Sequence, residues 1–160
     1  MIEILTTGGT FDTLPDGSIG PPRAAEVLAA ARVTLATRCY ELMRLDSSVI
    51  QDVHRQHMRR VIDASDAHRF IIVHGTDTML ETAAALGQLP DKVVVLTGSF
   101  VTADRPGDAA FNLGAALLAV QLLPPGAHVV MGGECFLPAR ARKNTQLRRF
   151  ERVPDPERMM

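Results

Sequence analysis

The sequence predicts an α/β fold: a single three-layer domain with a mostly parallel sheet of about five strands and helices on both faces, of the flavodoxin-like or Rossmann-like kind. Two observations lead to this prediction. Short apolar runs alternate along the chain with longer segments rich in helix formers, which is the order of a parallel sheet with helical crossovers. The runs are apolar throughout, as in Val93–Leu96, which is typical of strands buried on both faces.

The first predicted strand is short, apolar and β-branched, and it stops at Gly8 and Gly9. Four later runs have the same character, and the five predicted strands are Ile2–Leu5, Cys39–Leu45, Phe70–Val73, Val93–Leu96 and His128–Met131. The segments between them are long enough for right-handed crossovers, and the predicted helices lie near Pro22–Ala31, Ile50–Ala67, Thr78–Leu89 and Gly107–Leu122. No repeat or linker interrupts this order. We therefore expect one domain over residues 1–150 and a short tail over residues 151–160.

Length and composition exclude several classes of protein. The chain has 160 residues, 46% of them hydrophobic, which is enough for one full core and argues against disorder. The longest apolar stretch, Leu113–Leu123, contains Gly114 and Gln121 and is shorter than the roughly 20 residues that cross a bilayer. Glu3 and Asp12 argue against a signal peptide. We expect a cytoplasmic protein that does not bind membranes.

Charge and cysteine content point to neither nucleic acid nor disulfides. The formal net charge is −1, so the chain as a whole does not attract polyanions. A basic run near the end is interpreted as a solvated helix face rather than a polyanion site, and its members are Arg140, Arg142, Lys143, Arg148 and Arg149. Cys39 and Cys135 have no CxxC spacing and are expected to be small buried hydrophobes.

A small polar cluster follows each of the first four predicted strands. These clusters are TTGGTFD after the first strand, DSS at 46–48, HGTDT at 74–78 and TGS at 97–99. Because the carboxyl ends of parallel strands meet at one rim, hydroxyl, carboxylate and N–H groups should converge there. That arrangement is expected of an enzyme acting on a small polar molecule.

The clusters contain the parts of an activated threonine nucleophile. A threonine hydroxyl needs a neighbouring base and a third group that orients this base. The candidate parts are the hydroxyls of Thr10 and Thr76, the carboxylate of Asp77 and the amine of Lys143. Gly9 and Gly75 would let the backbone approach a substrate closely, so that N–H groups could stabilise an oxyanion.

Several polar residues also have a structural interpretation. Thr78 and Glu81 fit a capping box, and this role is preferred for them. Asp46 and Ser47 could cap the helix near Ile50–Ala67 or could bind a substrate, and the residues alone leave both roles open.

The histidines and glycine motifs indicate no metal or cofactor. His54 and His57 are three apart on a predicted helix, but no third metal ligand accompanies them, and they are expected to face solvent. His74 ends a buried strand and is interpreted as a hydrogen-bonded core residue. Neither GxGxxG nor GxxxxGK[ST] occurs, so no nucleotide cofactor is indicated.

Taken in order, the clusters resemble a known family. TTGGT, the DS of LDSS, VHGTDTMLETA, VVLTGS and DAAFNLGAAL resemble the amino-terminal domain of the bacterial-type L-asparaginases, from about residue 2 to residue 150. The closing RARKNTQLRRFE resembles the end of short, single-domain members of this superfamily. The resemblance implies an amidohydrolase that converts L-asparagine, or a related small amide, to the acid and ammonia.

The resemblance also implies roles for individual residues. Thr10 would be the nucleophile, Ser47 would hold the substrate α-carboxylate, and Thr76, Asp77 and Lys143 would form a second triad. Backbone N–H groups near Gly9 and Thr76 would serve the oxyanion. The residues expected to bind the substrate are Gly9, Asp46, Ser47, Gly75 and Ser99.

The sequence departs from the two-domain relatives in ways that leave alternatives open. They carry a tyrosine in the loop after TGGT, whereas FDTLPDGSIGPP has none. Arg142, one residue away, competes with Lys143 for the family lysine position. The alternative function is a catalytically inactive domain that binds a small amino acid or carboxylate. The helix Gly107–Leu122 has almost no polar face, which predicts a homodimer or homotetramer.

Overall fold

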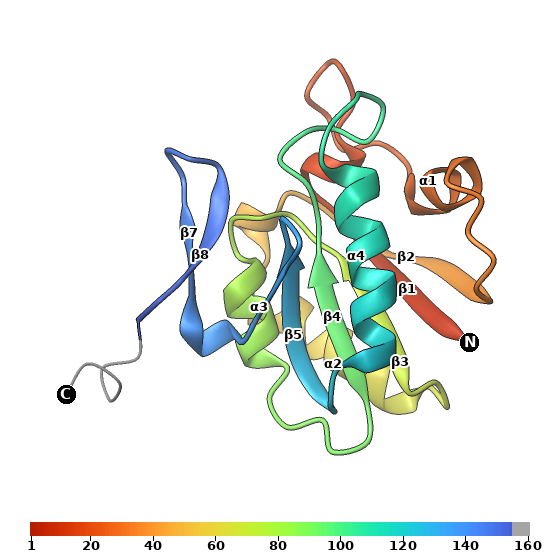
Figure 1. Cartoon of the computed structure of the whole chain (residues 1–160), viewed down its shortest axis with the longest axis vertical. Coiled ribbons are helices and arrows are strands. Elements are labelled where there is room, and N and C mark those ends of the chain that lie inside the picture. The colour runs from red at the N-terminus through yellow and green to blue at the C-terminus, as the bar shows by residue number, and fades with distance from the viewer. Residues whose placement is uncertain (155–160) are drawn as a thin grey trace.

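A six-stranded sheet lies at the centre of the molecule, in the strand order β2-β1-β3-β4-β5-β6 (Figure 1). The structure is a computed structural model and describes residues 1–154. The strands are β1 (Ile2–Gly8), β2 (Thr37–Leu45), β3 (Arg69–Val73), β4 (Val93–Thr97), β5 (Gly126–Met131) and β6 (Glu134–Phe136). The first five are parallel and β6 pairs antiparallel to β5, so the prediction of a mostly parallel sheet is confirmed.

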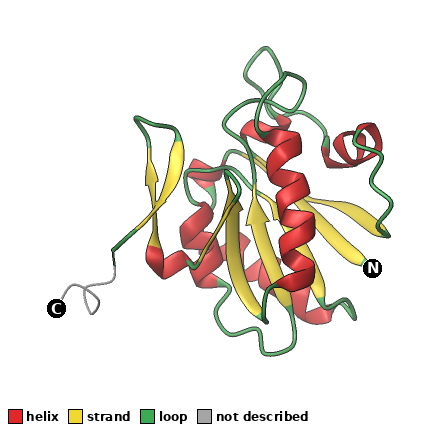
Figure 2. Ribbon diagram, in the orientation of Figure 1, coloured by secondary structure: helices red, strands yellow, loops and turns green. Residues whose placement is uncertain are grey.

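Helices cover both faces of the sheet and complete the three predicted layers (Figure 2). They are α1 (Ala24–Ala30), α2 (Asp52–Ala64), α3 (Met79–Ala85) and α4 (Ala109–Leu122). Ile4 and Ile71 pack in the core beneath α1 and α4, whereas their neighbours Leu5 and Phe70 pack beneath α2 and α3. Because successive side chains of a strand point to opposite faces, both faces need apolar residues, which explains the continuous apolar runs.

The strand order places a topological switch point between β1 and β3. The chain passes from β1 outward to β2 and then returns across β1 to β3, so the connections leave β1 and β3 in opposite directions. In open α/β sheets, ligands bind in the crevice at the carboxyl ends of the two strands that flank such a point.

The basic run is a hairpin, not the expected helix face. Strands β7 (Ala141–Asn144) and β8 (Arg149–Arg152) form a separate antiparallel ribbon, which stands beside α3 (Figure 1, blue). Phe150 is buried, with its ring centre 6.2 Å from that of Phe100 and 6.3 Å from that of Phe136. Lys143 and Phe150 point inward, and the arginines next to them point outward, which is the two-residue period of a strand. The many charged residues make this pattern hard to recognise in the sequence.

The structure corrects the capping box expected at Thr78 and Glu81, and it shows which helix Asp46 caps. Thr78 precedes α3, but its hydroxyl donates to the carbonyl of Ser47 at 2.7 Å and does not cap the helix, while Glu81 pairs with Arg55. Asp46 caps the short 3-10 helix Ser47–Val49 rather than α2. The N-cap of α2 is Gln51, whose N–H donates to Nδ1 of His54. At Thr78 and Glu81, long-range contacts replace the local bonds that the sequence pattern indicates.

Cys135 lies exposed on the edge strand β6 and not in the core as expected, while Cys39 is half-buried; both are free thiols. No helix within residues 1–154 is long and apolar enough to cross a bilayer. Strand β8 continues to Arg152, and the last six residues of the expected tail, 155–160, lie outside the described part of the chain.

Candidate active site

The site begins where β1 ends. Gly8 and Gly9 have φ angles of +96° and +80°, which L side chains rarely adopt, and they turn the chain into the 3-10 helix Thr10–Asp12. A Cβ on Gly9 would lie 2.5 Å from the Cα of Gly75, and one on Gly75 would lie 2.5 Å from Oγ of Ser47. The glycines therefore let the loops after β1, β2 and β3 touch, which brings Thr10 close to the HGTDT loop.

Lys143 reaches this place from the hairpin. Its Nζ donates to Oγ1 of Thr76 at 2.9 Å and to Oδ1 of Asp77, and its side chain is only 18% exposed. Arg142 instead points away and pairs with Glu151 at 3.1 Å, with 69% of its side chain exposed. The structure thus places Lys143, and not Arg142, beside Thr76 and Asp77.

A pocket of about 300 Å³ opens over these groups. All four predicted catalytic side chains line it, and the complete lining is Thr10, Thr76, Asp77, Phe100, Lys143, Thr145 and Arg148. This volume is at the lower end of small-molecule sites. Sequence reasoning missed Phe100, Thr145 and Arg148 as pocket residues. The last two lie in the turn of the hairpin, which the helix interpretation concealed.

Asp46, Ser47 and Ser99, which are expected from the sequence to bind the substrate, do not line this pocket. Ser47 is 2% exposed, and its Oγ accepts the N–H of Asp77 at 3.2 Å. Asp46 accepts the hydroxyl and N–H of Ser48, which lowers the pKa of its carboxyl. Ser99 is buried, and within residues 1–154 its hydroxyl has no hydrogen-bond partner. Asp46 and Ser47 support the loops through these hydrogen bonds.

Two buried ionisable groups flank the site. Asp12 accepts the N–H of Arg23 at 2.9 Å, and burial raises the pKa of its carboxyl to about 6. His74 is fully buried, its Nδ1 donates to the carbonyl of Gly75 at 2.7 Å, and burial lowers its pKa to about 4. His74 is therefore a neutral core residue, as expected, and not a base in the pocket.

The family model described as "Asparaginase, N-terminal" matches residues 1–157, nearly the whole chain. The chain belongs to the asparaginase family.

Solved asparaginase structures share the fold along almost the full chain. The thermostable L-asparaginase of Thermococcus kodakarensis is 27% identical, with a TM-score of 0.83 over 97% of this chain. L-asparaginase I of Vibrio cholerae is 25% identical, with a TM-score of 0.86 over 97% of this chain. The present chain covers 52% of the length of each of these proteins.

Curated relatives of this asparaginase-family chain carry a different name. A glutamyl-tRNA(Gln) amidotransferase subunit from Methanococcus maripaludis is 32% identical in an alignment of 150 residues that covers 83% of this chain. The Aeropyrum pernix protein of the same name is 34% identical over 150 residues. The chain spans about a third of these relatives, 35% in both cases.

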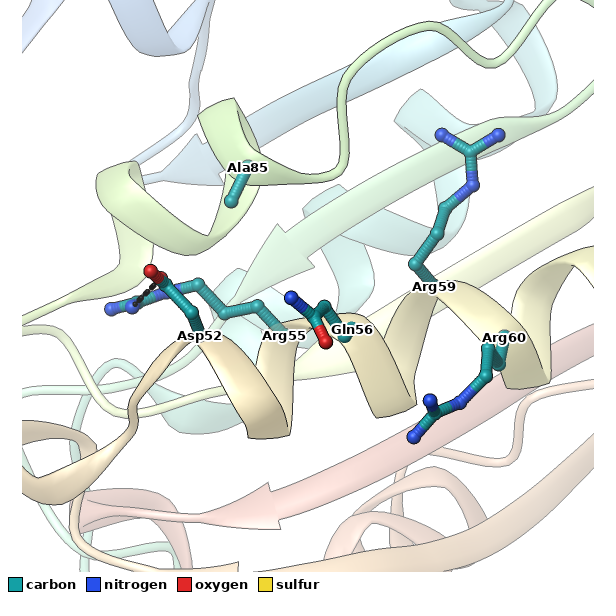
Figure 3. A pocket seen from close by; sticks show the side chains of 6 residues that line it. All are labelled: Asp52, Arg55, Gln56, Arg59, Arg60 and Ala85. Atoms are coloured by element: carbon teal, nitrogen blue, oxygen red, sulfur yellow. Dashed lines mark hydrogen bonds and ion pairs between the residues drawn. The ribbon is translucent and has the colours of Figure 1, made fainter.

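A second hollow of this asparaginase-family domain lies between α2 and α3, away from the threonines (Figure 3). Three arginines line it, but two of them hold the helices together: Arg55 bonds Asp52 and Thr82, and Arg59 bonds Asp63 and the carbonyl of Leu86. Neither a hydroxyl nor a buried acid lines this hollow, so we assign it a structural role. Among the described residues, no cluster of three or more potential metal ligands occurs.

Proposed function

We propose that this chain hydrolyses the side-chain amide of L-asparagine, or of a related small amide, to the acid and ammonia, with Thr10 as nucleophile. One observation carries the proposal. The pocket that exposes Thr10 also holds Lys143 hydrogen-bonded to both Thr76 and Asp77, so a hydroxyl, an amine and a carboxylate meet around a space for a small molecule. Relatives named as L-asparaginases and as amidotransferase subunits support amide chemistry.

The reaction then takes two steps. Oγ1 of Thr10 attacks the amide carbon, and its proton passes to the leaving nitrogen. The C–N bond then breaks, ammonia departs, and the acyl group stays on Thr10 as an ester. Water then attacks the ester carbon, and one of its protons passes through the relay of Thr76, Lys143 and Asp77 to Oγ1 of Thr10. The ester C–O bond breaks, the acid leaves and the hydroxyl of Thr10 is restored. Asp77 holds Lys143 in this relay through their ion pair.

The oxyanion donors differ in part from those that the resemblance implies. The N–H of Gly9 donates to the carbonyl of Leu45 at 3.0 Å and is not available to a substrate. The proposal therefore assigns the oxyanion to the N–H groups of Thr10 and Thr76. Gly9 and Gly75 contribute by packing, and Asp46 and Ser47 hold the loops that form the binding site.

A coupled ammonia assay tests the function. The purified chain is incubated with L-asparagine, L-glutamine and simple amides, and release of ammonia from at least one of them is expected. No release from any of them, together with measurable binding of L-asparagine, would favour the inactive binding domain instead. One observation favours that alternative: among residues 1–154, the loop Leu14–Gly20 contributes no side chain to the pocket beside Thr10.

A further inference from the structure

Arg148 places a positive charge in the pocket that no carboxylate neutralises. Three charged side chains line the pocket: Asp77, Lys143 and Arg148. Asp77 and Lys143 form an ion pair with each other, whereas Arg148 has no carboxylate partner within residues 1–154. The guanidinium of Arg148 therefore gives the pocket one unpaired positive charge, which can bind an anionic group of the ligand.

The guanidinium is held in place by Phe100. Its Nη2 donates to the carbonyl of Phe100, and its Cζ lies 5.9 Å from the centre of the Phe100 ring. The Nζ of Lys143 lies 5.6 Å from the centre of the same ring. One aromatic ring thus positions both cations, and it leaves most of the five N–H donors of Arg148 free to bind an acid.

The backbone at Arg148 adds a second observation. Its φ is +49°, in the left-handed region that favours glycine, and it ends the turn between β7 and β8. Arg32 has a similar φ of +54°, so the backbone alone assigns no role. The difference is that the side chain of Arg148 lines the pocket, where a glycine would leave no cation.

We propose that Arg148 binds the substrate carboxylate, and that the pocket takes monoamides of dicarboxylic acids whether or not they carry an α-ammonium. This rests on the proposed hydrolysis. Ser47 is buried and its hydroxyl accepts the N–H of Asp77, so it does not offer a hydrogen bond to a carboxylate in the pocket. The group that can bind this carboxylate is the guanidinium of Arg148. Asp77 is the only acid among the pocket-lining residues, and Lys143 already neutralises it, so an ammonium gains little there.

Matched amides separate the parts of this proposal. Succinamate has the amide and the carboxylate without an ammonium, butyramide replaces the carboxylate by a methyl group, and L-asparagine has both charges. A charge-assisted hydrogen bond corresponds to roughly 10-fold to 100-fold in binding. In Arg148→Ala, KM for succinamate should rise about 10-fold or more, and kcat/KM for butyramide, which has no carboxylate to bind, should fall by a clearly smaller factor. Arg142→Ala removes a charge from the outer side of the same hairpin and should change neither.

Binding of succinate, the product dicarboxylate, tests Arg148 without turnover. Calorimetric titration should give an affinity at least about 10-fold weaker for Arg148→Ala than for the wild-type chain, with Arg148→Lys in between, and thermal melts check that each variant is folded. Equal affinities, or no succinate binding by the wild-type chain, would overturn the proposal even if amides are hydrolysed. A wild-type chain that binds succinate through Arg148 and releases no ammonia would overturn only the proposed hydrolysis. If kcat/KM for L-asparagine were about tenfold or more above that for succinamate, the proposal that the pocket does not require an α-ammonium would be wrong.

Discussion

At the scale of single residues, Thr10 can be changed with little effect on the core, because it is only partly buried and lies outside both apolar clusters. Thr10→Ala should lower kcat by roughly 10³-fold or more, as expected for loss of a nucleophile. The free energy of unfolding should change by about 0.5 kcal/mol or less. Ammonia release and urea denaturation measure the two effects, and wild-type activity in this variant would exclude Thr10 from the mechanism.

Lys143→Arg distinguishes a base from a fixed positive charge. Arginine keeps the charge beside Asp77 but cannot take up a proton at neutral pH. We expect kcat to fall by roughly 10²-fold to 10⁴-fold, the usual contribution of an acid or base. Arg142→Lys is the control on the outer side of the hairpin and should leave kcat unchanged. A Lys143→Arg variant with normal kcat would mean that the lysine acts through its charge alone.

Asp12 should make stability depend on pH. Burial raises the pKa of its carboxyl from 3.8 to about 6, so the folded chain retains a proton that the unfolded chain loses between these values. This contribution to stability is fully present below pH 3.8 and is lost as the pH rises through about 6. Asp12→Asn keeps an oxygen for the N–H of Arg23, and at pH 8 it should raise the free energy of unfolding by up to roughly 3 kcal/mol. Urea denaturation at pH 8 and at pH 3.5 should show this gain only at the higher pH.

At the scale of secondary-structure elements, the hairpin β7–β8 depends on Phe150 for its attachment. Phe150→Ala removes the ring that packs against Phe100 and Phe136, at a cost of about 3 kcal/mol. Because the same hairpin carries Lys143, kcat should fall together with stability. Leu147→Ala, at an exposed position in the turn, is the control and should affect neither. Thermal melts and the ammonia assay on both variants test this coupling.

The elements differ in how well the sequence alone predicts them. Strands such as Val93–Thr97 are recognisable because burial on both faces demands an uninterrupted apolar run. The hairpin is not, because its charged residues suggest an exposed helix, and its one buried aromatic, Phe150, contacts residues far away in the chain. The pocket residues differ in the same way. Thr10, Thr76 and Asp77 directly follow strands of the parallel sheet, so the sequence predicts that they meet at one edge of it. Thr145 and Arg148 belong to the hairpin turn, which the sequence pattern does not reveal.

At the scale of the whole molecule, α4 exposes an apolar stripe. Phe111, Leu118 and Leu122 are each more than 60% exposed, while the opposite side of the helix packs in the core. We predict that this stripe contacts a second copy of the chain and that the protein is a homodimer or homotetramer. Sedimentation at micromolar concentration should show the oligomer, and Leu118→Glu should dissociate it. A wild-type chain that sediments only as a monomer would contradict the prediction.

The position of Lys143 along the chain also sets the order of events during synthesis. Chains are made from the amino terminus, and domains begin to form as they emerge from the ribosome. Thr10, Thr76 and Asp77 emerge with the strands of the sheet, and the amine that bonds Thr76 and Asp77 follows only with the hairpin. A nascent chain can therefore hold Thr10, the proposed nucleophile, in a formed sheet and still lack the proposed relay. The proposed hydrolysis would then begin only when the hairpin has docked, so the onset of ammonia release during translation would report this docking.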